Sequence, residues 1–241
     1  MTRVGFVTGL AVEARVLRGS LGAEQGAALL VACAGADPRR AKASAEALIE
    51  AGAAALVSYG IAGGLDPGLA AGAVVLPEAV LTPGGPVLAT ARAWRESLHE
   101  RAGGAGAGLA DARLAGGALL GSDRAVAAVA EKRGLFEAWG AIAVDMESHA
   151  VALAARDAGL PFLCLRAVAD PAGRPLPRAV QGSIASDGRP RAALVTARLM
   201  LRPWEIVEVG RLRRDARAAL RALGAVTRAL GPDLARFHGD V

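Results

Sequence analysis

Three apolar segments, spaced along one chain, each have the pattern of a buried strand that ends in glycines or in a carboxylate. Their sequences are VSYGIAGG at 57–64, AVDMES at 143–148 and LRAVAD at 165–170. A fourth carboxylate, Glu13, follows the first apolar run of the chain in the same way. Because an open parallel sheet gathers the carboxyl ends of its strands in one crevice, where ligands bind, we expect these residues to lie together. Carboxylates that meet in one crevice indicate acid–base chemistry on a small polar ligand.

The alternation of short apolar runs with helical patterns predicts an α/β protein with three layers, α/β/α, around a central mixed, mostly parallel sheet. The chain has 241 residues, of which 53% are hydrophobic and only 3% aromatic, so its core must consist mainly of Ala, Val and Leu. We expect residues 1–201 to form one domain and residues 202–241 an arginine-rich helical C-terminal extension. Strands are expected at 3–8, 27–34, 54–59, 73–81, 118–120, 142–144 and 162–169. Helices are expected at 11–18, 38–51, 91–102, 122–139, 147–158, 191–201 and 203–230, and a tight turn at 60–64.

The cysteines and the apolar stretches limit the classes of protein to consider. Cys33 and Cys164 each lie inside an apolar run, which predicts buried thiols in a reducing cytoplasm. The sequence contains no CxxC, no HExxH and no cluster of histidines, so we expect neither a metal nor a cofactor. The longest uncharged stretch, 51–65, is too short for a membrane helix, which needs about 20 apolar residues. The first ten residues lack the pattern of a signal peptide, so we expect a cytoplasmic protein.

Each candidate residue also has an ordinary structural explanation. The glycines at 60–64 would suit any tight turn. Glu147 would favour the dipole of a helix that starts beside it, Asp170 would end a strand before a turn, and Glu13 would be an exposed helix residue. The functional interpretation is that Glu147 accepts two hydrogen bonds from a diol, and that burial raises the pKa of Asp170 so that it holds a proton.

The order and spacing of these motifs resemble the purine nucleoside phosphorylase and nucleosidase superfamily. Its marks are a glycine-rich turn, a V-E-M-E-type segment and an R-A-x-x-D segment, which here are GIAGG at 60–64, VDME at 144–147 and RAVAD at 166–170. The resemblance covers roughly residues 3–200 and implies the nucleoside phosphorylase fold. The substrate-binding residues that it implies are Gly60, Ile61, Ala62, Gly63, Asp145, Met146 and Glu147.

The resemblance also implies a reaction, the cleavage of an N-glycosidic bond. Met146 and Glu147 would contact the ribose, Asp170 would protonate or hydrogen-bond N7 of the departing purine, and Glu13 would activate water. Cleavage leaves positive charge on the sugar and negative charge on the base. An acid at N7 stabilises the base and typically contributes about 10²–10⁴-fold, while a diol clamp orients the sugar for the nucleophile.

Two departures from the family pattern bear on the nucleophile. Phosphate-using members commonly have Ser or Thr where Ile61 stands, and some have Arg where Ser58 stands. An Ile side chain cannot donate a hydrogen bond to phosphate, so the sequence favours water without excluding phosphate. The aromatic residue that stacks on adenine in related nucleosidases is replaced near Ala125.

The C-terminal part narrows the resemblance to the hopanoid-associated phosphorylases. The features that show this resemblance are PAGRPLP at 171–177, DGR at 187–189 and a long arginine-rich segment beyond them. That group is thought to remove adenine from adenosylhopane, a nucleoside that carries a large triterpene. In the present chain, the final predicted helix has an apolar face with arginines around it. That face consists of Leu212, Ala216, Leu220, Leu223 and Leu230. Such a helix either lies on an anionic membrane, at the inner face of which the protein would be peripheral, or packs on the domain or on a partner subunit.

Three functions follow from these features. The first is release of adenine from adenosylhopane by water or phosphate, and the second is a soluble nucleosidase for methylthioadenosine or S-adenosylhomocysteine. The third is a nucleoside-binding module without catalysis. A nucleic-acid partner is not expected, because the arginines are concentrated at one end and aromatic stacking residues are scarce. The family resemblance implies a homo-oligomer.

Overall fold

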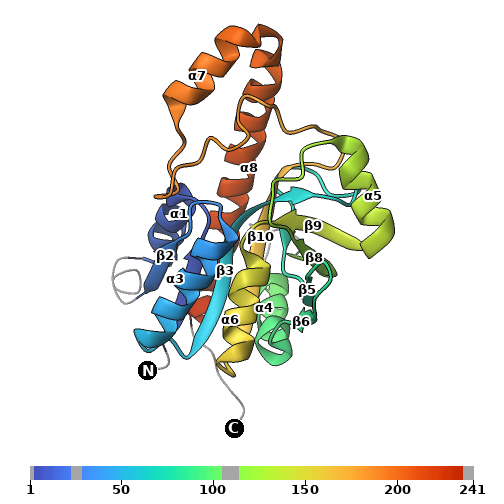
Figure 1. Ribbon diagram of the computed structural model, residues 1–241. Helices are drawn as coiled ribbons and strands as arrows, with labels where there is room; N and C mark the ends of the chain where they lie inside the picture. Colours follow the sequence, from blue (N-terminus) through green and yellow to red (C-terminus); the bar gives the residue numbers. More distant parts are fainter. Residues whose placement is uncertain (1–2, 23–28, 105–113, 236–241) are drawn as a thin grey trace.

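The computed structural model describes residues 3–22, 29–104 and 114–235, and the predicted three-layer α/β fold is confirmed (Figure 1). One ten-stranded sheet has the order β6-β5-β8-β9-β3-β10-β4-β7, and β1 pairs with both β3 and β2. Its strands are β1 Val4–Thr8, β2 Leu30–Cys33, β3 Ala55–Gly64, β4 Val74–Val75, β5 Ala79–Leu81, β6 Val87–Ala89, β7 Leu114–Ala115, β8 Ala118–Gly121, β9 Ala141–Asp145 and β10 Phe162–Asp170. The α-helices of the described residues are α1 Ala11–Leu21, α3 Pro38–Glu50, α4 Arg92–Gly104, α5 Val129–Trp139, α6 Ser148–Asp157, α7 Ala192–Leu201 and α8 Ile206–Leu230.

The sheet is mixed, with β3 at its centre. β3 runs parallel to β1 and to β10, and its last two residues pair antiparallel with β9. The parallel pairs β1–β2, β4–β7, β5–β8 and β8–β9 complete the mostly parallel arrangement. The ends of β3, β9 and β10 therefore meet, as the three sequence motifs predict.

Helices cover both faces of the sheet. Apolar residues of α3 and α6 form one core cluster with the sheet, and those of α1, α4 and α8 form the other. A smaller cluster lies between α5 and the strands β8 and β9. These clusters consist mainly of Ala, Val and Leu, as the composition predicts.

The C-terminal half of α8 belongs to the core of the domain. Ala219, Leu223, Val226 and Leu230 are fully buried in the same cluster as strands β3 and β10. The Tyr59 hydroxyl on β3 lies 2.8 Å from the hydroxyl of Thr227, which adds a buried polar contact between helix and sheet. The apolar face predicted for this helix thus packs on the domain along its second half.

Three predicted elements differ from the structure, and a fourth lies partly outside the described residues. Residues 60–64 continue β3 rather than form a tight turn, because their backbone pairs with β10 and β9. The predicted strand 73–81 is divided into β4 and β5 around Pro77. The helix predicted at 122–139 begins only at Val129, since Ser122 Oγ bonds locally to the Arg124 backbone. In the predicted strand 27–34, residues 27 and 28 lie outside the described residues.

Candidate active site

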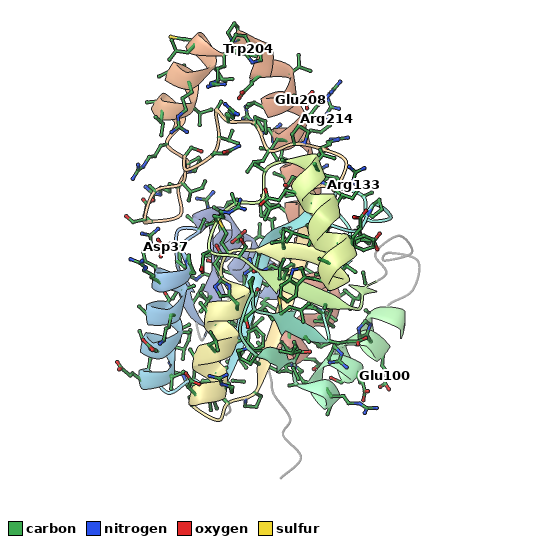
Figure 2. All side chains as sticks on the ribbon, turned by 45° about the vertical axis from the view of Figure 1, so that its right-hand side comes forward. Asp37, Glu100, Arg133, Trp204, Glu208 and Arg214 are labelled. Atoms are coloured by element: carbon green, nitrogen blue, oxygen red, sulfur yellow. The ribbon has the colours of Figure 1, made fainter. Side chains whose placement is uncertain are left out.

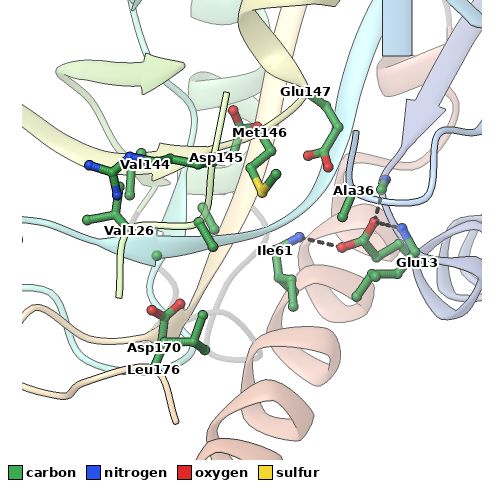
Figure 3. Close-up of a pocket in the computed structure, with 16 residues that line it drawn as sticks. Glu13, Ala36, Ile61, Val126, Val144, Asp145, Met146, Glu147, Asp170 and Leu176 are labelled. Carbon is green, nitrogen blue, oxygen red and sulfur yellow. Dashed lines mark hydrogen bonds between the residues drawn. The ribbon is translucent and has the colours of Figure 1, made fainter. Parts of the chain in front are cut away.

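A pocket of about 180 Å³ opens where β1, β3, β9 and β10 end (Figure 3). It holds Glu13 and Glu147 on one side and Asp170 on the other. Each carboxylate comes from a different segment, one after β1, one after β9 and one at the end of β10. Its lining residues are Gly9, Leu10, Glu13, Ala36, Ile61, Ala62, Gly63, Arg124, Ala125, Val126, Val144, Asp145, Met146, Glu147, Asp170 and Leu176.

Glu13 is held in place by backbone amides. Its Oε2 accepts hydrogen bonds from the amides of Gly9 at 2.9 Å and Leu10 at 2.8 Å, and its Oε1 accepts one from Ile61 at 2.9 Å. Glu13 is buried, not exposed. Burial raises the pKa of its carboxyl above the usual range, although the Arg166 guanidinium and the three amides lower it. Its geometry is therefore fixed by the main chain of two strand ends.

Glu147 is the N-cap residue of α6, immediately after β9, and is buried. Its Oε2 lies 3.2 Å from Nη2 of Arg166. Burial raises the pKa of the Glu147 carboxyl to about 8, against the lowering effect of Arg166. A Cβ at Gly9 would lie only 2.7 Å from its Oε1, so the absence of a side chain there gives this carboxylate its space.

Arg166 is a fully buried cation behind the pocket, and sequence reasoning assigned it no role. Its Nη2 lies 2.7 Å from Asp145 Oδ2 and donates to Ser58 Oγ at 2.6 Å. Asp145 also accepts hydrogen bonds from the backbone and the hydroxyl of Ser148. The buried charge of Arg166 is thus balanced by Asp145, with the Glu147 carboxyl group beside it, and such pairing is the condition under which a buried ion persists.

Lys132 is a second functional residue that sequence reasoning missed. It is fully buried on α5, and its Nζ donates to Oδ2 of Asp170 at 2.7 Å. The same ammonium donates to the carbonyl oxygens of Asp170, Pro171 and Arg174 at 3.0, 3.2 and 3.0 Å. Burial raises the pKa of the Asp170 carboxyl, and Lys132 opposes that rise. One available clue was its rarity, because the chain has only two lysines among 28 basic residues.

The glycine-rich end of β3 supplies space and an amide, not a tight turn. A Cβ at Gly60 would lie 2.6 Å from Arg166 Nη1 and from Glu13 Oε1, so Gly60 lets this ion cluster approach the strand. Ile61, Ala62 and Gly63 line the pocket itself. All predicted site residues except Gly60 line one pocket, and Gly60 lies directly behind it. Among the described residues, no group of three or more His, Cys, Asp or Glu could hold a metal ion.

The chain belongs to the phosphorylase superfamily, whose family model matches residues 11–201. It is thus an enzyme of the nucleosidase and nucleoside phosphorylase class, as the motifs predict. No curated protein matches its sequence.

Solved structures of low sequence identity share the fold. The methylthioadenosine/S-adenosylhomocysteine nucleosidase of Helicobacter pylori, with 5′-methylthioadenosine in its active site, is 14% identical with a TM-score of 0.66, over 94% of this chain and 98% of that one. The nucleosidase of Neisseria meningitidis in complex with methylthio-immucillin-A is 20% identical with a TM-score of 0.63, over 95% and 100%. The futalosine hydrolase of Helicobacter pylori is 17% identical with a TM-score of 0.64, over 93% and 97%.

Proposed function

We propose that the protein cleaves the N-glycosidic bond of an adenine nucleoside with water as the nucleophile, and that its natural substrate is adenosylhopane. The observation that carries the reaction is the placement of Glu147 and Asp170 on opposite sides of one pocket, with Glu13 next to Glu147. A nucleoside bound between them would have its ribose at Glu147 and its base at Asp170. The bond to be broken would then face Glu13.

Asp170 is the proposed acid. Burial raises the pKa of its carboxyl, which favours the protonated form needed to stabilise the departing purine at N7. Oδ2 of Asp170 is occupied by Lys132, so the purine would meet the other side of the carboxyl group. Glu147 is the proposed acceptor for the ribose hydroxyls, with Met146 beside it in the pocket.

The charges of the pocket support water rather than phosphate. In the described part of the chain, each cation at the pocket already has partners: Arg124 pairs with Glu131 and Arg166 with Asp145, while the Lys132 ammonium is enclosed by Asp170 and three backbone carbonyl oxygens. A phosphate dianion would find no free cation there to balance its charge, which is electrostatically unfavourable. A water molecule meets no such barrier, and Glu13 is positioned to polarise it.

The choice of adenosylhopane rests on the resemblance of the C-terminal segment and on the apolar part of the pocket. Leu10, Val126 and Leu176 line it beside the carboxylates. We further propose that the protein acts in the cytoplasm, peripherally at the inner face of an anionic membrane, and assembles as a homo-oligomer. A soluble nucleosidase for methylthioadenosine or S-adenosylhomocysteine is the second candidate, because solved nucleosidases of that kind share the fold along almost the whole chain.

The test is to incubate the purified protein with adenosylhopane, methylthioadenosine or S-adenosylhomocysteine, with and without phosphate. Free adenine measures bond cleavage, and the sugar product distinguishes hydrolysis from phosphorolysis. We expect adenine and a free ribosyl product from adenosylhopane, independent of phosphate. A sugar 1-phosphate would refute water as the nucleophile, faster turnover of the two soluble nucleosides would favour the second candidate, and no adenine from any of the three would refute the reaction.

A further inference from the structure

The end of the hairpin formed by α7 and α8 carries a cluster of exposed apolar side chains, which we call the apolar tip. It consists of Met200, Leu201, Trp204, Ile206 and Val207, which are 77%, 78%, 69%, 57% and 60% exposed. The described residues include eight large apolar side chains that are exposed, and five of them belong to this tip. Single exposed apolar residues are ordinary, but a contiguous group marks an interaction site.

The apolar tip lies at the outer end of the hairpin, where Glu205 accepts a hydrogen bond from the backbone of Ala179 at 2.8 Å. Figure 1 shows α7 and the first part of α8 projecting above the sheet, and Figure 2 places Trp204 at the end of this hairpin. The first buried residue of α8 is Asp215, nine residues after the helix begins at Ile206. At about 1.5 Å per residue, the tip lies roughly 13 Å beyond the packed part of the helix.

Arginines surround the base of the apolar tip. Residues 191–217 include seven arginines against three acidic residues. Arg202 and Arg211 are paired with Glu205 and Glu208. Arg213 and Arg214 are exposed, and no carboxylate within the described residues forms an ion pair with either. Positive charge is therefore available just behind the apolar side chains.

We propose that the apolar tip inserts into the surface of an anionic lipid bilayer. Interfacial segments bury their apolar side chains about 5–10 Å into the headgroup and acyl boundary, which the projection of the hairpin allows. Trp is favoured at that depth, and arginines near an anionic surface strengthen the attraction to it. Within the described residues, no helix is long and apolar enough to span a membrane.

A second copy of the chain fits the apolar tip less well than a bilayer. A symmetric dimer through this hairpin would bring two sets of arginines together, and like charges at an interface are unfavourable. A stable interface also needs about 800 Å² from each partner, usually from a broad face rather than a projecting end. An anionic bilayer accepts both the apolar side chains and the positive charge.

The apolar tip and the pocket are joined by one segment. Residues 171–191 lead from Asp170 to α7, and Leu176 in this segment lines the pocket. The backbone carbonyl of Gly188 accepts a hydrogen bond from the amide of Ala11, the first residue of α1. Arg174 forms an ion pair with Asp215 on α8, which ties the segment to the base of the hairpin. A docked tip would hold the pocket near the lipid surface, where a lipid-linked nucleoside would be bound. This consequence rests on the proposed function, because a soluble substrate would not need the pocket to be near lipid.

The experiment measures binding of the full-length protein to vesicles by co-sedimentation, with 30% phosphatidylglycerol in phosphatidylcholine or with phosphatidylcholine alone. The variants are Trp204→Asp, Arg213→Gln with Arg214→Gln, and Val87→Asp as the control. Val87 is 68% exposed, close to the 69% of Trp204, but lies on β6 away from the hairpin. Release of adenine from adenosylhopane, methylthioadenosine and S-adenosylhomocysteine is measured in parallel.

We expect Trp204→Asp to weaken binding to anionic vesicles at least about 10-fold and the double arginine variant at least about 5-fold, with Val87→Asp unchanged. Vesicle binding by the wild type that neither tip variant reduces would overturn the proposal, as would no binding at all. A wild-type dimer that Trp204→Asp dissociates in the absence of lipid would also overturn it and assign the tip to a second copy. Vesicle binding without cleavage of any nucleoside would refute the proposed function and leave the docking site standing.

Discussion

Removing the ammonium of Lys132 tests how the acid of the site is held. Lys132→Met keeps an unbranched side chain of similar length and deletes the cation that lies 2.7 Å from Asp170 Oδ2. The variant also leaves the carbonyl oxygens of Asp170, Pro171 and Arg174 without this donor. Both the stability and the pH dependence of the enzyme should change.

The loss of stability follows from the geometry of the ion pair. When Asp170 is ionised, its charge and that of Lys132, 2.7 Å apart, attract by about 6 kcal/mol at an effective dielectric constant of about 20. Desolvation of both groups offsets part of this attraction, and removal of one partner from a buried pair typically costs about 3–5 kcal/mol. For a domain of this size each kcal/mol lowers the melting temperature by about 2–4 °C, so we expect a fall of about 6–20 °C.

The pH dependence has a definite sign. Lys132 lowers the pKa of the Asp170 carboxyl, so its removal lets burial raise that pKa further. The proposed acid would then keep its proton to higher pH, and the alkaline limb of kcat/KM should move to higher pH. Scanning calorimetry and a pH profile of adenine release measure the two effects.

Lys42→Met is the matched control, because Lys42 is the other lysine of the chain. It lies on the surface of α3 and pairs with Glu46 at 3.8 Å, where an exposed pair contributes less than about 1 kcal/mol. A Lys132→Met enzyme with an unchanged melting temperature and an unshifted alkaline limb would refute the assignment of Lys132 as the residue that positions and tunes Asp170.

Three further substitutions test the carboxylates and the space around them. Asp170→Asn should reduce adenine release at least about 10²-fold and leave circular dichroism nearly unchanged, with Asp157→Asn on the surface of α6 as the control; full activity would place the acid elsewhere. Glu147→Gln should remove ribose binding, and it should also change the pH dependence of stability. Because the pKa of Glu147 is raised to about 8, the wild type binds an extra proton when folded and should lose up to about 5 kcal/mol between pH 4.5 and 8. The free energy of unfolding in urea, measured at pH 5 and pH 8, tests this assignment. If Glu147→Gln loses as much stability between the two pH values as the wild type, Glu147 is not the group responsible. Gly9→Ala should raise KM, because the new Cβ would lie 2.7 Å from Glu147 Oε1; steady-state kinetics that match the wild type would show that Glu147 moves freely.

Strand positions were largely predictable, because continuous apolar runs such as residues 162–169 have few alternatives to a buried strand. The extension of β3 through residues 60–64 was not predictable, because glycine adopts both turn and strand conformations. The pairing of Gly63 with Val144 and Asp170 decides the outcome, and that pairing depends on strands far away in the sequence. Local chemistry likewise misplaced the start of α5, where Ser122 closes a short turn instead of a helix cap.

The residues of the site likewise divide into those that the sequence predicts and those that it does not. Glu13 and Asp170 stand at the ends of strands that run parallel to β3, and this topology is enough to predict that they meet. Glu147 follows β9, which pairs antiparallel with β3, so its place depends on the extension of β3 through residues 60–64. Lys132 is the fourth residue of α5, and apart from the rarity of lysine in the chain, the sequence of this helix contains no feature of a site. Its role depends on how α5 packs against the end of β10, which no local pattern encodes. Arg166 stands inside a buried strand, where only the positions of Asp145 and Glu147 explain a charge.

The two halves of α8 differ in how far they are shielded from water. From Asp215 onward the helix has buried residues in every turn, whereas the residues before it have none. Amide hydrogens near Leu230 should therefore exchange with deuterium only when the whole domain unfolds, while those near Ile206 should exchange by local fraying. Exchange rates measured along this one helix would show a gradient from its outer end to its inner end, and a bound surface at the outer end would slow exchange there first.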